Sequence, residues 1–164
     1  MEEYIEDLTR VLLKLDLGLI RSLTLLIRQS PRIWIVGNGG SMSTATHFAE
    51  DLIKLADKKA VAVSCPSLLS MCANDYGDRE MFSFPLSKLA DLDDLVILIS
   101  TSGRSPNIVK VIESIHCKKF LITGLGGQFA DVGKLVIKSY DVQILEDVSL
   151  IITHMVCKYY GREQ

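Results

Sequence analysis

The stretch RIWIVGNGGSMSTATHFAEDLIK, residues 32–54, decides how the rest of the chain can be read. Residues 32–36 are rich in β-branched and aromatic side chains and predict a buried strand. Three glycines between positions 37 and 40 allow a sharp turn. A helix is then expected from Ser41 to about Leu55, with the Ser41 hydroxyl as its cap. This arrangement commonly holds an anion, although a turn using glycine for geometry alone is the alternative.

Two nucleotide-binding motifs of similar design do not fit this turn. A phosphate loop of the nucleotide-hydrolase type needs Lys and then Ser or Thr after its last glycine, where this chain has Ser41 and Met42. A dinucleotide fingerprint needs a small residue in place of Met42 and an acidic residue ending the next strand, which here ends in Ser64 and Cys65. We therefore expect no nucleotide cofactor.

Composition sets broad limits on the class of protein. The chain has 164 residues, of which 48% are hydrophobic, with mean hydropathy +0.27 and net charge −2. Those values predict one globular domain over residues 1–164 and argue against nucleic-acid or membrane-surface binding. The four cysteines show no CxxC spacing, and neither a secretory leader nor a membrane-spanning run is recognisable. We expect a cytoplasmic protein with reduced thiols.

Strand-like and helix-like segments alternate along the chain. Apolar residues at helical spacing mark residues 1–29, with a kink or break at Gly18; this segment packs on its own domain or, as we favour, on another subunit. Further strands are expected at residues 60–65, 95–99, 119–123 and 135–138, and helices at about 41–55, 79–90, from 106, between the last two strands, and at 146–160. The alternation predicts an α/β fold with a parallel sheet and helices on both faces.

A second loop, after the strand at 95–99, is rich in hydroxyl groups. Ser100, Thr101, Ser102 and Ser105 place four hydroxyls within six residues, beside Gly103 and before a helix N-terminus. Ligands of such sheets bind at the carboxyl ends of strands, and hydroxyls with free backbone N–H groups bind phosphate without a lysine. The alternative is a turn whose hydroxyls only cap the helix.

Four segments in order give the chain a specific resemblance. They are GNGGS at 37–41, HFAED at 47–51, ANDYG at 73–77 and ISTSGRSPN at 99–107. With them the chain resembles the sugar-isomerase (SIS) domain family and, within it, the phosphoheptose isomerases. The resemblance implies a three-layer sandwich with a five-stranded parallel sheet of order 2-1-3-4-5, and a homotetramer with active sites at subunit interfaces. It also implies interconversion of sedoheptulose 7-phosphate and D-glycero-D-manno-heptose 7-phosphate through an enediol, supplying heptose for lipopolysaccharide or capsule.

The resemblance assigns roles to particular residues. Phosphate binding falls on Ser41, Ser100, Thr101, Ser102 and Ser105, and the remaining substrate contacts on Asn38, Gly39, Gly40, Asn74 and Asp75. The catalytic carboxylate falls on Asp51, where phosphoheptose isomerases carry Glu, and the catalytic imidazole on His154. Some relatives hold zinc, and the matching ligand positions are His47, Asp51, Glu146 and His154.

The residues themselves are compatible with these roles. His47 and Asp51 are separated by four positions, so both project from one helix face, as paired metal ligands often do. Asp147 lies seven residues before His154 and aligns with it better than Glu146 does, so the choice of Glu146 rests on the family. An enediol mechanism needs a carboxylate base and an acid–base partner, although His154 could also be a core histidine. Asp51 reaches about 1.5 Å less far than Glu would.

Two other functions fit the same sequence. One is a non-catalytic SIS protein that binds a sugar phosphate or another protein, like the relative that assists the bacterial replication initiator. The other is an isomerase of a different phosphosugar. Retention of both Asp51 and His154 favours catalysis over binding alone.

Overall fold

A single parallel sheet organises the molecule. The computed structural model describes residues 1–126, 129 and 132–160. Its five strands are β1 (Arg32–Gly37), β2 (Lys59–Ala62), β3 (Leu95–Ser100), β4 (Lys118–Thr123) and β5 (Gly133–Val136). They pair in the order β2-β1-β3-β4-β5, all parallel, which confirms the expected sheet. The central strand β3 is buried along its whole length, as expected of a strand covered on both faces.

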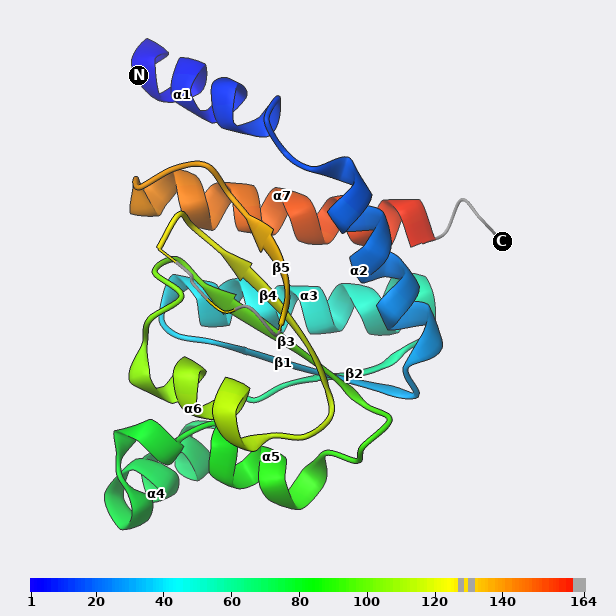
Figure 1. Cartoon of the computed structure of the whole chain (residues 1–164), viewed down its shortest axis with the longest axis vertical. Coiled ribbons are helices and arrows are strands. Elements are labelled where there is room, and N and C mark those ends of the chain that lie inside the picture. The colour runs from blue at the N-terminus through cyan, green and yellow to red at the C-terminus, as the bar shows by residue number, and fades with distance from the viewer. Residues whose placement is uncertain (127–128, 130–131, 161–164) are drawn as a thin grey trace.

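Helices cover both faces of this sheet (Figure 1). One face carries α1 (Glu2–Leu12), α2 (Leu17–Gln29), α3 (Gly40–Ala56) and α7 (Val142–Tyr160); the other carries α4 (Pro66–Tyr76), α5 (Ser83–Leu89), α6 (Pro106–Ser114) and the 3₁₀ turn η1 (Asp78–Glu80). A hydrophobic cluster fills each of the two interfaces. Both α3 and α7 begin at the carboxyl edge of the sheet and pack side by side. That pairing positions the groups described below.

Two aspartates start helices at places the sequence reading missed. The leading segment divides at residues 13–16 rather than at Gly18, because the Asp16 carboxylate accepts hydrogen bonds from Gly18 N (2.9 Å) and Leu19 N (3.1 Å) and so starts α2. The last helix begins at Val142 rather than near residue 146, because Asp141 Oδ1 accepts a hydrogen bond from Ile144 N at 3.1 Å. Both corrections have the same cause, an aspartate cap one residue before the helix.

Smaller differences concern the strands. β2 ends at Ala62 rather than at residue 65, although Val63 N still donates to Ile35 O at 3.0 Å. β5 covers 133–136 instead of 135–138. The short helix expected between β4 and β5 lies largely outside the described residues. Among the described helices, none is both long and apolar enough to span a bilayer.

Candidate active site

The glycine turn between β1 and α3 is built for close approach of the backbone. Gly39 has φ +53°, a conformation that favours glycine, and it is the residue before the helix. The expected Ser41 cap is wrong: Ser41 is already the second helical residue, and no side chain caps α3. A Cβ at Gly37 would lie 2.6 Å from the Ser41 carbonyl oxygen. Glycine is therefore needed there for space, and it lets Ser41 sit against the strand end, 5% exposed.

The serine-rich loop holds its own shape with two of its hydroxyls. Ser100 Oγ accepts a hydrogen bond from Gly103 N at 3.1 Å, and Ser102 Oγ accepts one from Arg104 N at 3.1 Å. Each of these hydroxyls acts as an acceptor and keeps its own proton to donate. The interpretation of these hydroxyls as helix caps is wrong, because no side chain caps α6 and the two bonds go to loop residues before the helix. Both hydroxyls keep an O–H donor for a ligand.

A pair of amides ties the two loops together. Asn38 Nδ2 donates to Asn107 Oδ1 at 3.0 Å, and Asn107 Nδ2 donates to Asn38 Oδ1 at 2.9 Å. Asn107 Oδ1 also accepts from Ile108 N at 3.0 Å, in the first turn of α6. Asn38 was expected to contact substrate, and this stays a prediction: the pair uses one N–H of its amide and leaves the second as a donor. Sequence reasoning missed Asn107, for which the only signal was its place beside Pro106 at the start of a helix.

Arg104 is a second residue that the sequence reading left out. Its Nε donates to Gly126 O at 3.1 Å, which holds the guanidinium beside the serine-rich loop. The side chain lines a cavity of about 260 Å³ together with Thr101 and Ser102. A guanidinium has five N–H donors, so the remaining ones can serve an anion in that cavity. The position of Arg104 among the four hydroxyl residues of this loop was the sequence signal that could have identified it.

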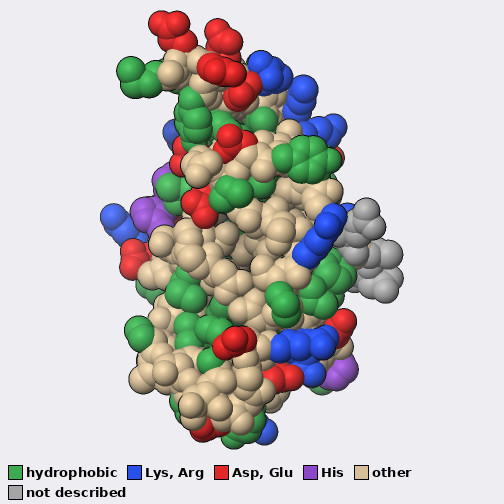
Figure 2. All heavy atoms as spheres, turned by 90° about the vertical axis from the view of Figure 1, so that its left-hand side faces the viewer, with side chains coloured by type: hydrophobic (Ala, Val, Ile, Leu, Met, Phe, Trp, Pro, Cys, Tyr) green, Lys and Arg blue, Asp and Glu red, His purple; other side chains and the backbone are tan. Residues whose placement is uncertain are grey.

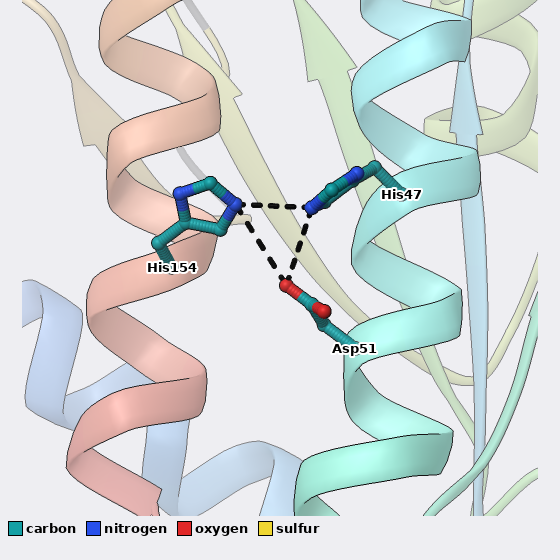
Figure 3. A group of neighbouring side chains, drawn as sticks. All are labelled: His47, Asp51 and His154. Atoms are coloured by element: carbon teal, nitrogen blue, oxygen red, sulfur yellow. Dashed lines mark hydrogen bonds and ion pairs between the residues drawn. The ribbon is translucent and has the colours of Figure 1, made fainter.

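Three side chains from α3 and α7 converge below these loops (Figure 3). His154 Nε2 lies 3.0 Å from His47 Nε2, and Asp51 Oδ2 lies 3.4 Å from His47 Nε2 and 3.8 Å from His154 Nε2. The two imidazoles are about half exposed and Asp51 is 20% exposed. His154 therefore faces this group and is not a core histidine. Although Asp51 is shorter than Glu, its Oδ2 lies within 4 Å of both imidazoles.

The separations of these three atoms suit a metal ion. In a tetrahedral zinc site with bonds near 2 Å, two ligand atoms lie about 3.3 Å apart, and the observed 3.0, 3.4 and 3.8 Å bracket that value. Two imidazole nitrogens and one carboxylate oxygen form a donor set typical of catalytic zinc, which leaves one position open. The group formed by His47, Asp51 and His154 could hold a metal.

A cavity beside this group lies between the C-terminal parts of α3 and α7. It has a volume of about 460 Å³ and is lined by Asp51, Leu55, His154, Cys157 and Lys158. Burial, and then the charge of Asp51, raises the pKa of the Cys157 thiol to about 12, so this thiol stays protonated at neutral pH. The reactive groups therefore border open space into which a small molecule can enter.

Comparison with known proteins decides the family. A model of the SIS domain matches residues 5–127. The phosphoheptose isomerase of Buchnera aphidicola is 33% identical over all of this chain and 81% of its own length, and that of Helicobacter pylori is 34% identical over 93% and 87%. The chain belongs to the phosphoheptose isomerases of the SIS-domain family. A solved phosphoheptose isomerase from Neisseria gonorrhoeae has the same fold, with TM-score 0.90 at 23% identity over 97% of this chain and 96% of that one.

One expected metal ligand of this phosphoheptose isomerase lies elsewhere. The Glu146 carboxylate rests against Gly40, where a Cβ would overlap it, and it is outside the group formed by His47, Asp51 and His154. The better-aligned Asp147 is also engaged, because its Oδ2 accepts a hydrogen bond from Tyr4 OH at 2.7 Å. The structure thus brings together three of the four predicted ligands.

Two predicted substrate contacts are also distant from the histidines within one chain. Asn74 and Asp75 lie at the end of α4, on the other face of the sheet, and Asn74 Nδ2 donates to Asp75 Oδ1 at 2.7 Å. Both side chains are exposed. In a single phosphoheptose isomerase chain they are not part of the group shown in Figure 3.

The carboxyl edge of the sheet carries little charge at its centre. Figure 2 looks onto this edge, where backbone and uncharged polar side chains dominate the middle and charged side chains gather at the margins. From Ser41 to His47, α3 advances six residues, or about 9 Å. The phosphoheptose isomerase chain therefore presents hydroxyl groups at the start of α3 and reactive side chains about 9 Å further along the same helix.

Proposed function

We propose that this phosphoheptose isomerase interconverts sedoheptulose 7-phosphate and D-glycero-D-manno-heptose 7-phosphate by proton transfer. The observation that supports this reaction is the convergence of Asp51, His47 and His154 within 3.8 Å of one another. Ser41, at the start of the same helix, lies about 9 Å from His47 along the axis of α3. A ketose–aldose exchange needs a positioned carboxylate and an acid–base partner, and both are present.

Substrate binding is assigned to the carboxyl edge of the sheet. The hydroxyls of Ser41, Ser100, Thr101, Ser102 and Ser105 and the backbone of Gly39 and Gly40 receive the phosphate. The Asn38–Asn107 pair keeps the two loops in register. Binding the phosphate far from the reacting carbons converts its binding energy into orientation of C1 and C2.

Proton transfer is assigned to Asp51 and His154. Asp51 accepts the proton from C1 of the ketose, the C1–H electrons form the C1–C2 double bond of an enediol, and the protonated Asp51 returns the proton to C2. His154 moves the oxygen proton between O1 and O2, so atoms and charge balance at each stage. His47 Nε2, 3.0 Å from His154 Nε2, orients that imidazole.

A zinc ion is the metal that this donor set fits best. We infer that His47, Asp51 and His154 would hold it, and that when bound it polarises the oxygens at C1 and C2. Glu146 would have to leave Gly40 to join them.

A homotetramer is proposed for the assembly. Large apolar side chains are exposed on α1, on α2 and between them, among them Ile5 (62%), Leu13 (82%), Leu17 (51%) and Leu25 (51%). Helix α1 extends from the body of the molecule in Figure 1, which suits packing against another copy. In such an assembly Asn74 and Asp75 reach a neighbouring site. Light scattering coupled to gel filtration tests the assembly, and a monomer at micromolar concentration would contradict it.

The reaction is tested with a panel of five-, six- and seven-carbon ketose phosphates. We expect turnover of sedoheptulose 7-phosphate, with deuterium incorporated from D₂O at the carbon that gains a proton. Asp51→Asn and His154→Ala should each lower kcat by about 10²–10⁴-fold. Glu50→Gln, the same charge change about 100° around α3, is the matched control. Equal activity in Asp51→Asn and Glu50→Gln would refute the assignment, and absence of turnover on the whole panel, with zinc added, would favour a binding role.

A further inference from the structure

Lys158 is the one basic residue among those that line the cavity beside the reactive group. That cavity, about 460 Å³, is lined by Asp51 and Leu55 of α3 and by His154, Cys157 and Lys158 of α7. Lys158 and His154 are separated by four positions on α7, so both project from the same face of the helix. Nothing in the sequence pattern distinguished this lysine from an ordinary surface residue.

The ammonium group of Lys158 has no competing partner among the residues that the structure describes. Within residues 1–126, 129 and 132–160, it makes no hydrogen bond or ion pair, and the side chain is exposed. Lys158 also borders a smaller groove that contains Arg21. Repulsion from Arg21 on that side and attraction to Asp51 on the other both favour a position of the ammonium in the larger cavity.

We propose that Lys158 binds the reacting end of the substrate and stabilises the negative charge that develops on its oxygens. This role rests on the proposed function. When Asp51 takes the carbon proton, electron density moves toward the neighbouring oxygen. A positive group already in place beside that oxygen stabilises the transition state more than the neutral substrate. A compact ammonium on a flexible stem can reach an oxygen in a cavity of this size.

A structural role for the same residue makes a different prediction. A lysine in the last turn of a helix interacts favourably with the helix dipole, and that effect would change stability without changing catalysis. The test therefore compares Lys158→Met, which removes the charge at similar length, with Lys158→Arg, which keeps it. Lys118→Met is the matched control, since Lys118 is exposed at the start of β4 and is not among the residues that line this cavity.

Kinetics of the full-length enzyme give the first measurement. We expect Lys158→Met to lower kcat for sedoheptulose 7-phosphate about tenfold or more, with a change in KM below about threefold, because the interaction strengthens in the transition state. Lys158→Arg should recover most of the loss, and Lys118→Met should match the wild type. Unchanged kcat in Lys158→Met would overturn the proposal, as would a loss that Lys158→Arg does not restore.

Binding of two substrate analogues gives the second measurement. The seven-carbon aldonate phosphate carries a carboxylate at the reacting end, whereas the alditol phosphate is neutral there. By calorimetry, Lys158→Met should weaken aldonate binding about tenfold and leave alditol binding unchanged; equal effects on both would overturn the proposal. Wild-type turnover with no effect of Lys158→Met refutes only the role of Lys158. A wild type inactive on every phosphosugar refutes the proposed function and this inference with it.

Discussion

Gly37→Ala tests whether the turn after β1 is shaped for a ligand. The added Cβ would lie 2.6 Å from the Ser41 carbonyl oxygen, 2.7 Å from its carbonyl carbon and 2.9 Å from its Cβ. Two of those atoms are backbone, in the first turn of α3, and cannot rotate away. Ordinary contact requires 3.4 Å, so the start of the helix must retreat by about 0.8 Å, the difference between 3.4 and 2.6 Å.

This displacement has two calculable consequences. Overpacking of a tight contact costs about 1–3 kcal/mol of unfolding free energy, which corresponds to a fall in melting temperature of ~2–12 °C for a chain of this size. A shift of nearly 1 Å at a substrate-positioning group can also lower kcat/KM by up to about 10²-fold. If Gly37 served only the geometry of the turn, the substitution would lower stability without lowering kcat/KM.

The assay therefore measures stability and ligand binding in the same variant. Thermal unfolding gives the first quantity, and steady-state kinetics with inorganic phosphate as competitor gives the second. Ser43→Ala, an exposed residue in the same helical turn, is the control and should resemble the wild type in both. A stable Gly37→Ala enzyme with unchanged phosphate affinity would show that Ser41 is not part of the anion site.

Three further outcomes are expected. His47→Ala should lower zinc affinity at least tenfold in equilibrium dialysis, because it removes one of three converging ligand atoms; unchanged affinity would place the metal elsewhere. Cys65 should be the fastest of the four thiols to react with iodoacetamide at pH 7, since hydrogen bonding by Ser67 lowers the pKa of this exposed thiol. Ser67→Ala should slow the reaction of Cys65, and faster reaction of a buried thiol would contradict this reasoning. The Tyr4 hydroxyl donates a hydrogen bond to Asp147, and this bond raises the pKa of the phenol from 10.0 to about 12. The bond therefore stabilises the folded protein below about pH 10, and this stability is lost as the pH rises through 12. Tyr4→Phe should accordingly lose a tyrosinate absorbance step near pH 12, and loss of a step near pH 10 would contradict the contact.

The inner strands β1, β3 and β4 were predictable because each contains a short apolar run in a sheet covered on both faces. β1 and β3 need no other signal than their buried side chains. The order of the strands could not be derived in this way, because alternation of strands and helices allows several orders. The resemblance to SIS domains supplied the order that the structure shows. The helix starts at Leu17 and Val142 were missed because a single preceding aspartate decides each of them.

The candidate site was predictable where spacing along one helix determines it. His47 and Asp51 share a face of α3 because they are four residues apart, and the structure places both in one group. The choice between Glu146 and Asp147 could not be made in this way, since neighbouring positions differ by about 100° and the packing of α7 sets the rotation. That packing directs Glu146 to Gly40 and Asp147 to Tyr4. Asn107 was beyond prediction, because its role depends on a contact with a loop 69 residues away.

The distance between phosphate binding and proton transfer follows from how α3 and α7 pack. Both helices start at the carboxyl edge of the sheet and lie side by side, so each residue along them moves a side chain about 1.5 Å from that edge. Ser41 at the start of α3 and His47 six residues later are therefore about 9 Å apart along the helix. An extended sugar phosphate can bridge that separation only if its reacting carbons are well removed from its phosphate. In the proposed reaction, the loops at the sheet edge bind the phosphate and the helix pair transfers the protons, so the helical rise between them sets the length of substrate that reaches both.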